Sequence, residues 1–380
     1  MMIDTSQRAI LRSLWFHGAL SRSELHDLTG MTPNAVGNEV LQLQRLGLVK
    51  ELGPKPSTGG RPQIPLILDP SSRRILGISI EPGRVEIAEL GLNGDLTVAP
   101  ISKMVEAEGR LLPTATRLAR SYCVRRTLMA AASITGLIDH LTGSILLSSS
   151  APHQNQLSTS VLLKGLDDVP LIIGNDLHAA AGRWAVTHRS QLQEDTLLIA
   201  FDDGRMGAVM VINGRPNHGC IIGANELGHT RFPVKTPMCY CGQSGCMERI
   251  FSREFLGADV APAEFTNRVQ AAAADDGKSI EMIKLLIMAC ANAVNFVRPS
   301  RLVLASRFMA SNSFSQQLTN GIRESVLPHL AERVQIDSWD IKVAGSAETA
   351  AWLGLASLLF ESWESYPSTV AAGAQHAPVM

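Results

Sequence analysis

The stretch GHTRFPVKTPMCYCGQSGCMER, residues 228–249, places one histidine and three cysteines within eighteen positions. Soft thiolates and an imidazole are the usual ligands of a tetrahedral Zn²⁺ ion. Four protein ligands close the coordination sphere, so we expect a structural zinc ion that fixes a loop. The predicted ligands are His229, Cys239, Cys241 and Cys246.

Two other interpretations of this cluster are a redox pair and a set of unrelated buried thiols. A C-x-C spacing is poorly suited to a thioredoxin-type redox motif, and Gly242 and Gly245 supply the tight turns that a small metal loop needs. The other cysteines, Cys123, Cys220 and Cys290, lie singly in apolar surroundings. This usage favours cytosolic thiols plus a metal site over a secreted disulfide framework.

The composition indicates an ordinary folded protein with more than one domain. The chain has 380 residues, of which 45% are hydrophobic and 18% charged, and its formal net charge is -1. Such a charge gives no global attraction to nucleic acid, so DNA binding would need a local arrangement. The N-terminus lacks the pattern of a signal peptide, and no apolar run reaches the roughly 18 residues that cross a bilayer. We therefore expect a cytoplasmic, nucleoid-associated protein without a membrane partner.

Three short helical patterns follow one another in residues 5–53, TSQRAILRSLWFHGALSRSELHDLTGMTPNAVGNEVLQLQRLGLVKELG. In the first, residues 10, 11, 14 and 15 are apolar and share a face. The second opens with Ser21 and Glu24, a capping box, and ends at Gly30. The third has an apolar stripe at Val36, Val40 and Leu43. Two short strand-like runs then bracket a Gly- and Pro-rich loop, PKPSTGGRPQ, at residues 54–63.

Helix, turn, helix and a hairpin with a basic loop predict a winged helix-turn-helix domain. The third helix would enter the major groove of double-stranded operator DNA, and the loop would place one arginine in the minor groove. Lys50 would lie near phosphates. The predicted DNA contacts are Thr32, Pro33, Asn34, Gly37, Asn38, Lys55, Gly60 and Arg61.

A packing module, a dimerisation module and a protein-binding winged helix remain alternatives for this segment. Residues 1–70 carry seven Lys and Arg against six Asp and Glu, which is weakly basic for a DNA-binding domain. Modest non-specific affinity is expected, so useful binding would require a homodimer or homotetramer on two half-sites.

From residue 74 onward, short β-rich runs alternate with helical stretches, which is typical of an α/β fold. The runs lie at 73–80, 84–90, 170–176, 196–201, 208–214 and 301–306, and the helical stretches at 176–188, 280–297 and 346–363. Residues 75–90 and 196–214 open alike, with strand, turn and strand, which suggests a duplicated core. The final helical stretch is apolar enough to pack back onto the body.

Taken together, these motifs resemble those of the ROK family (repressors, open reading frames and sugar kinases). Residues 226–229 match the family's E-x-G-H motif, residues 239–248 its C-x-C-G-x-x-G-C-x-E motif, and residues 174–176 its Asn-Asp pair. The resemblance extends from about Ile10 to Trp363. It implies a two-lobed, actin-like and ribonuclease-H-like fold with a sugar cleft between the lobes and zinc beside it.

The resemblance also implies a set of sugar-contacting residues. Carboxylates and an amide can hold adjacent sugar hydroxyls, which both donate and accept. His229 would bind zinc through one ring nitrogen and a sugar hydroxyl through the other. Asp176 can also be read as a helix cap and Glu226 as a solvated charge. The implied set is Asn175, Asp176, Glu226, His229 and Glu248, with Gly136 and Ser149 from a loosely aligned loop.

The loops that hold ATP phosphates in the family's kinases differ in this chain. Residues 79–83, SIEPG, stand in place of D-x-G-G-T, and residues 202–208, DDGRMGA, in place of G-T-G-x-G-G-G. On the adenosine side, residues 305–307 replace glycines. Carboxylates at these positions would repel a triphosphate, and proline removes a backbone donor. Without a phosphoryl donor, Asp176 has no role as the kinases' general base.

We therefore expect a sugar-responsive transcriptional regulator, a repressor of carbohydrate genes, and not an enzyme. A bifunctional ATP-dependent sugar kinase with a DNA-binding extension is the main alternative, and a scaffold that recruits a transporter is a third. The expected domains are a winged helix at 1–72, a first lobe at 73–190, a second lobe at 191–366 whose last helix returns to the first lobe, and a tail at 367–380.

Overall fold

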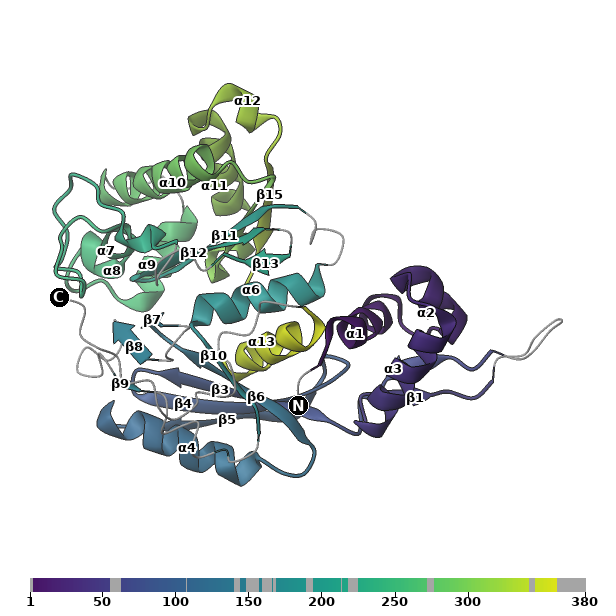
Figure 1. Ribbon diagram of the computed structural model, residues 1–380. Coiled ribbons are helices and arrows are strands. Elements are labelled where there is room, and N and C mark those ends of the chain that lie inside the picture. The colour runs from purple at the N-terminus through teal and green to yellow at the C-terminus, as the bar shows by residue number, and fades with distance from the viewer. Residues whose placement is uncertain are drawn as a thin grey trace, which may run out of the picture.

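A computed structural model shows two five-stranded sheets and a separate group of N-terminal helices (Figure 1). It describes residues 3–54, 63–106, 108–139, 144–147, 157–158, 166, 169–188, 194–212, 214–217, 225–271, 277–341 and 346–360. The fold is mixed α/β, as the alternation of strand and helix patterns predicts.

Of the three N-terminal helices, the second begins and ends at its predicted caps, and the third begins at its predicted cap. They are α1 (Thr5–His17), α2 (Arg22–Thr29) and α3 (Pro33–Arg45). Ser21 and Glu24 form the predicted capping box, Gly30 ends α2 in the left-handed region, and Thr32 caps α3. The antiparallel pair β1 (Val49–Glu51) and β2 (Leu66–Leu68) follows. The apolar stripe of α3 is fully buried among these elements.

The first large sheet has the strand order β10-β6-β3-β4-β5. Strands β3, β4 and β5 form an antiparallel meander, whereas β6 and β10 run parallel to β3. Their bounds are β3 (Arg74–Glu81), β4 (Arg84–Gly91), β5 (Leu96–Met104), β6 (Thr127–Ile134) and β10 (Leu171–Gly174).

The second large sheet has the order β13-β12-β11-β14-β15 and repeats the topology of the first. Numbered along the chain within each sheet, both have the strand order 3-2-1-4-5. Again the first three strands form an antiparallel meander and the last two are parallel to the first. The strands are β11 (Thr196–Asp202), β12 (Arg205–Ile212), β13 (Arg215–Pro216), β14 (Arg301–Ala305) and β15 (Gln335–Trp339). The similar openings at 75–90 and 196–214 thus belong to two copies of one sheet.

Two apolar helices lie between the sheets in Figure 1, α6 (Asp176–Thr187) and α13 (Ala347–Leu359). Helix α13 packs against α6 and against β3, β4 and β6, so the last described helix of the chain covers the first sheet. The approach is very close: a Cβ added at Gly77 would lie 1.8 Å from the carbonyl oxygen of Ala347. A glycine is therefore required at this point of β3.

Other helices cover the outer faces. Helix α4 (Leu111–Tyr122) lies on the first sheet, and α10 (Gly277–Val297) and α11 (Asn312–Ser325) lie on the second. The shorter elements are η1 (Glu108–Arg110), β7 (Leu137–Ile138), β8 (Ser144–Leu147), β9 (Leu157–Ser158), η4 (Leu227–His229), α7 (Met247–Ile250), α8 (Arg253–Leu256), α9 (Pro262–Ala271), η5 (Arg307–Ala310) and α12 (Pro328–Ala331).

Among the described residues, α10 alone is long and apolar enough to cross a membrane by length and composition. The sequence analysis predicts no apolar segment of that length, so α10 departs from that prediction. One face of α10, which includes Met282, Leu286 and Cys290, is buried in the second hydrophobic core. Side chains of α7, α11 and β14 belong to the same core. This packing is that of a core helix.

Candidate functional site

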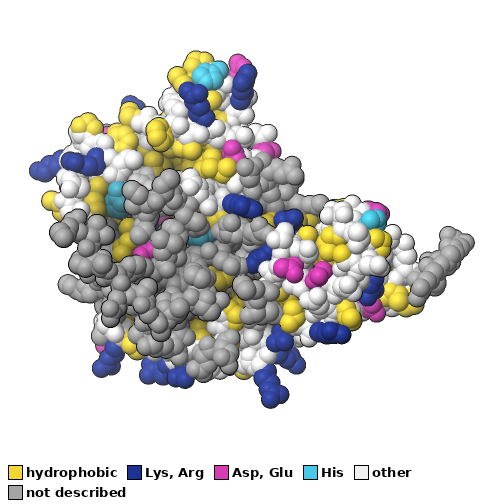
Figure 2. Space-filling model, viewed as in Figure 1, with side chains coloured by type: hydrophobic (Ala, Val, Ile, Leu, Met, Phe, Trp, Pro, Cys, Tyr) yellow, Lys and Arg dark blue, Asp and Glu magenta, His cyan; other side chains and the backbone are white. Residues whose placement is uncertain are grey.

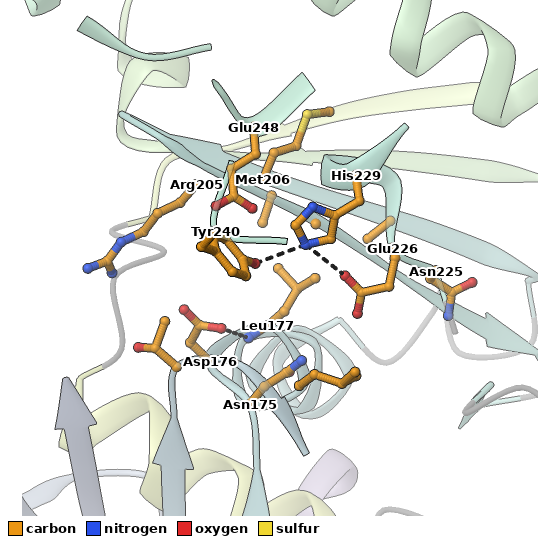
Figure 3. Close-up of a pocket in the computed structure, with 16 residues that line it drawn as sticks. Asn175, Asp176, Leu177, Arg205, Met206, Asn225, Glu226, His229, Tyr240 and Glu248 are labelled. Carbon is orange, nitrogen blue, oxygen red and sulfur yellow. Dashed lines mark hydrogen bonds and ion pairs between the residues drawn. The ribbon is translucent and has the colours of Figure 1, made fainter. Parts of the chain in front are cut away.

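A cavity of about 160 Å³ lies between the two sheets, and polar side chains from both sides line it (Figure 3). Its lower wall is the start of α6, and its upper wall is formed by β12, η4 and α7. Figure 3 shows the carboxylates of Asp176 and Glu248 and the ring of His229 directed toward a common space. The lining residues that carry polar side chains are Thr135, Asn175, Asp176, Arg205, Asn225, Glu226, His229, Tyr240 and Glu248.

The start of α6 holds two of the predicted sugar contacts. The helix is capped by Asn175, whose side-chain oxygen accepts a hydrogen bond from the backbone N–H of His178 at 2.7 Å. Asp176 is the first residue of the helix and accepts from the N–H of Leu177 at 3.0 Å. The expectation that Asp176 is the cap was therefore wrong, because the chain is still extended at Asn175 and turns helical at Asp176.

Three carboxyl groups share this small cavity, and their burial, together with their mutual proximity, disfavours ionisation. Burial raises the pKa of Asp176 from the ordinary 3.8 to about 6, while the nearby charge of Arg205 opposes this shift. Burial raises the pKa of Glu248 to about 8, and the charges of Glu226 and Asp176 add to the effect. Burial and Asp176 also raise the pKa of Glu226. Near neutral pH the cavity thus offers both carboxylate acceptors and a carboxylic acid donor.

The four predicted metal ligands come together. The ligand atoms of His229, Cys239, Cys241 and Cys246 all lie within 4.8 Å of one another. His229 Nδ1 is 3.7 Å from Cys239 Sγ, and the Sγ atoms of Cys241 and Cys246 are 3.6 Å apart. A tetrahedral ion with metal–sulfur bonds of about 2.3 Å separates its ligand atoms by roughly 3.5–3.8 Å. These two separations fit a tetrahedral ion, and the four ligand atoms lie close enough together to bind one ion.

The chemistry of the four residues also fits a metal ion. Burial lowers the pKa of His229, which keeps the imidazole neutral. Burial and the neighbouring Cys241 raise the pKa of Cys246 to about 12, so thiolates gathered here need a cation to balance them. Gly242 and Gly245 adopt φ values of 83° and 85°, which supports the predicted tight turns of this loop.

His229 connects the Cys/His group to the cavity. Its Nδ1 faces the thiols, while its Nε2 forms a hydrogen bond of 2.9 Å with the Tyr240 hydroxyl and lies 3.8 Å from Glu226 Oε2. A metal ion on Nδ1 would fix the ring and leave Nε2–H as a donor to the cavity. The two ring nitrogens thus have the two separate environments that the sequence analysis expected.

Ion pairs hold the two loops that the resemblance aligns with the kinases' phosphate loops. Glu81 Oε2 accepts from Arg84 at 2.7 Å, and Glu81 Oε1 lies 3.6 Å from Arg205 across the cleft. Asp202 pairs with Arg307 at 2.8 Å.

Asp203 accepts a hydrogen bond of 2.8 Å from the backbone N–H of Arg253. Beside the first cavity, a second cavity of about 370 Å³ is lined by Pro82, Asp203, Arg205 and Glu248 among others. Three carboxyl groups (Asp203, Glu248, Glu254) and three arginines (Arg205, Arg249, Arg253) line this second cavity. Carboxyl groups with cationic neighbours therefore occupy the region where the resemblance places a nucleotide's phosphates.

The remaining predicted contacts are placed as follows. Gly136 lines the first cavity, at φ 131°. Thr32, Pro33, Asn34 and Asn38 are exposed on α3, and Gly37 is half-buried with open space where a Cβ would be. Ser149, Lys55, Gly60 and Arg61 lie outside the described residues.

The sequence analysis did not include three polar residues that line the cavity, Arg205, Asn225 and Tyr240. Tyr240 stands between two predicted ligands, Cys239 and Cys241, so its position in the metal loop was a usable signal. Asn225 directly precedes the E-x-G-H motif and has φ 67°, an unusual conformation for a residue other than glycine. The sequence analysis places Arg205 in the segment that stands for a phosphate loop and does not include it among the sugar-contacting residues.

Comparisons with known proteins identify the family of this chain. The sequence model described as the ROK family matches residues 117–362. The chain is 22% identical to the DNA-binding transcriptional repressor Mlc of Escherichia coli (strain K12), over 92% of each chain. It is 20% identical to the xylose repressor of Bacillus subtilis (strain 168), covering 94% of this chain and 95% of the repressor.

Solved structures show the same fold. A ROK family transcriptional regulator, described as a homologue of the E. coli Mlc protein, superposes with a TM-score of 0.72 at 20% identity, covering 93% of this chain and 97% of that one. A ROK family glucokinase from Streptomyces griseus, in complex with glucose and AMPPNP, gives a TM-score of 0.58 at 16% identity and covers 75% of this chain and 98% of its own. The regulator structure thus matches nearly the whole chain, and the glucokinase structure matches three quarters of it.

Proposed function

The chain belongs to the ROK family, and we propose that it is a sugar-responsive, DNA-binding transcriptional regulator that represses genes of carbohydrate uptake or catabolism. The observation that carries this proposal is the contrast within the cleft. Its sugar side keeps an amide, three carboxyls and an imidazole around one cavity, whereas its nucleotide side carries acidic residues that pair with arginines.

The cavity suits a sugar because its polar groups alternate between acceptors and donors. Asn175 and Asp176 on one wall and Glu226 and Glu248 on the other can each accept from, or donate to, neighbouring hydroxyls. His229 Nε2 supplies a further donor on the same side. A polyol that joins the two walls binds the closed arrangement better than the open one, which is the condition for an effector.

We infer that the Cys/His group holds a structural Zn²⁺ ion. The support is the donor set, the proximity of the four ligand atoms, and their number, which is enough to complete a tetrahedral coordination sphere. When bound, the ion supplies no reactive position and serves to fix the loop that carries His229 and Tyr240. Its contribution to function would be the orientation of the sugar cavity.

We propose that residues 1–72 form a winged helix-turn-helix domain that binds operator DNA. The three capped helices and the β1–β2 pair support this, as do the exposed Asn34 and Asn38 on α3. Lys55, Gly60 and Arg61 would belong to the wing. Residues 73–190 and 191–366 are the two proposed lobes of the sugar-binding region. The proposed DNA-binding form is a homodimer or homotetramer in the cytoplasm.

Helix α6 offers a direct connection between the sugar cavity and α1. Its first turn carries Asn175 and Asp176, and at its other end the carbonyl of Val186 accepts a hydrogen bond of 3.0 Å from Trp15 Nε1. Trp15 also packs edge-on against Trp352 of α13, with ring centroids 6.0 Å apart. A shift of α6 on sugar binding would therefore move α1 and the winged helix with it.

A further tie joins α1 to α13. The Arg8 side chain donates to the backbone carbonyls of Ser357 and Phe360. Because a buried guanidinium with backbone partners is costly to displace, α1 should follow the body of the protein as one unit. The N-terminal helices are therefore joined to the rest of the protein by specific side-chain contacts and not by a flexible linker alone.

The experiment is a thermal-shift screen of sugars and sugar phosphates with the full chain, followed by gel shift with each hit. We expect at least one sugar to raise Tm and to change operator binding. In the Glu226→Ala variant the sugar-dependent rise in Tm should disappear while operator binding without sugar persists. If this variant responds to the sugar as the wild type does, the cavity is not the effector site. ATP-dependent phosphorylation of a screened sugar would instead favour the kinase with a DNA-binding extension.

A further inference from the structure

We propose that the solvent face of α4 and the residues around it form a second DNA-binding surface, which contacts backbone phosphates that flank the operator. This surface, here named the α4 basic face, consists of Lys103, Arg110, Arg117, Arg120, Arg125 and Arg126. The proposal rests on the proposed function, because it presupposes that the winged helix binds DNA.

Helix α4 is amphipathic, and its two faces have opposite characters. Leu111, Leu112, Ala115 and Ala119 are buried against β3 and β4. Arginines 110, 117 and 120 are all exposed. Figure 2, viewed as in Figure 1, shows Lys and Arg side chains gathered along the lower edge of the molecule, where Figure 1 places α4. The helix thus presents cations to solvent on the side away from the sheet.

Neighbouring segments extend the cationic character of α4. Lys103 on the edge strand β5 stands opposite Val85 in register, and Val85 belongs to the core that α4 covers, so Lys103 lies on the same side of the sheet. Arg125 and Arg126 are exposed in the turn that follows α4. Residues 103–126 contain six Lys and Arg against two Asp and Glu, in a chain whose net charge is -1.

About half of the other described arginines pair with a carboxylate, whereas the α4 basic face gathers several cations without such a partner on one helix and its flanks. Arg84, Arg183, Arg253, Arg268 and Arg301 each pair with a carboxylate. Within the described part of the chain, no salt bridge involves five of these residues, namely Lys103, Arg110, Arg117, Arg125 and Arg126. These cations therefore keep their full attraction for an external polyanion.

The α4 basic face adjoins the N-terminal helices through Arg73. Its Nε donates to the carbonyl of Leu46, the C-cap of α3, at 2.9 Å, and its NH1 donates to the carbonyl of Arg125 at 3.1 Å. One side chain thus joins the end of α3 to the turn that carries Arg125 and Arg126. A duplex held by α3 would then have cations of the body close to its flank.

This surface explains how a weakly basic winged helix can bind DNA. Residues 1–70 hold seven basic and six acidic residues, so they contribute little net attraction to phosphates. Each phosphate that a cation neutralises releases counterions and adds about 0.9 to the dependence of log K on log salt. Cations outside the winged helix would supply affinity without sequence preference, and operator choice would remain with α3.

The test compares two duplexes that carry the same site, selected by the full wild-type chain from a random duplex library. The short duplex covers only the footprint of α3 and the wing, and the long duplex adds flanks on both sides. The variant is Arg110→Gln/Arg117→Gln/Arg126→Gln. We expect the wild type to prefer the long duplex, and the variant to lose about tenfold in affinity for it and about 2.7 in salt slope. Affinity for the short duplex should be unchanged.

A matched control removes three charges elsewhere, with Lys284→Gln/Arg298→Gln/Arg333→Gln, all exposed positions on the second sheet's side. This control should bind both duplexes as the wild type does. Equal binding of the long duplex by wild type and the α4 variant overturns the inference, while short-duplex binding leaves the proposed function intact. If the wild type selects no duplex at all, the proposed function fails and the inference falls with it.

Discussion

The first hairpin turn of each large sheet has the same pattern, an acidic residue followed two and three positions later by glycine and arginine. The arginines of the two turns nevertheless make different contacts. Residues 81–84 read EPGR and residues 202–205 read DDGR, and in each turn the acid pairs in register with the arginine. Gly83 and Gly204 both have φ 67°. The backbone of the turn is therefore duplicated along with the sheet.

The arginine side chains of these two turns have different partners. Arg84 stays within its own sheet and pairs with Glu81 and Glu86. Arg205 reaches across the cleft to Glu81 and lines both cavities. The second sheet also carries the Cys/His loop, in the segment between β13 and β14, and the first sheet has no such group among the described residues. One topology is thus used twice, and the additions to the second copy supply most of the site.

The largest expected effect concerns the loop that only the second sheet carries. Cys246→Ser removes one of four metal ligands, and we expect the free energy of unfolding to fall by more than about 3 kcal/mol, because loss of a structural metal ranks among the largest single-residue effects. Urea denaturation and the zinc content of the purified protein measure this. Cys123→Ser, at a half-buried thiol outside the group, is the control and should keep the metal. A metal-free, equally stable Cys246→Ser protein would refute the structural role.

An intermediate effect should separate the two turns. Arg205 lines the cavity and opposes the rise in the pKa of Asp176, whereas Arg84 lines neither cavity. We expect Arg205→Gln to weaken sugar binding about tenfold, which corresponds to about 1.4 kcal/mol, and Arg84→Gln to change it less than about twofold. Isothermal titration with a sugar from the screen measures both. Equal losses would mean that the cross-cleft position of Arg205 is irrelevant to the ligand.

The smallest effect is a pH dependence from Asp176. Its pKa is raised in the folded protein from 3.8 to about 6, chiefly by burial. The group therefore contributes stability that is complete below about pH 4 and is lost as the pH rises through about 6. Relative to Asp176→Asn, which does not titrate, the wild type should lose about 1 kcal/mol between pH 5.5 and pH 8. Paired urea titrations at the two pH values check this, and a pH-independent difference contradicts it.

The sequence predicted the N-terminal helices well because their ends are marked by local chemistry. Ser21 with Glu24, Gly30 and Thr32 act within a few residues, and all have the predicted roles. Strand β6 was not predicted, although it lies between β3 and β10 at the centre of the first sheet. Its sequence, TLMAAASI, is rich in alanine, whose strand propensity is low, and only tertiary pairing makes it a strand.

The candidate site was predictable as far as motifs carried it. The Cys/His spacing and the E-x-G-H and Asn-Asp matches placed five cavity residues and four ligand residues that the structure brings together. Arg205 was assigned differently because its pairing with Glu81 joins residues 124 positions apart, on two separate sheets. No local pattern encodes such a contact. The helix cap is Asn175 and not Asp176, because α6 begins one residue earlier than the alternative reading of Asp176 as a cap assumes. Helix ends are difficult to place from sequence to within one residue.

The most direct test of the account titrates the operator-bound full chain with the sugar that raises its Tm, with and without ATP and Mg²⁺. DNA release is followed by fluorescence anisotropy, and sugar phosphate by mass spectrometry. The account predicts at least tenfold weaker operator binding with sugar, identical curves with and without ATP, and no phosphorylated sugar. Operator binding that ignores the sugar, or release that requires ATP and yields sugar phosphate, would contradict it.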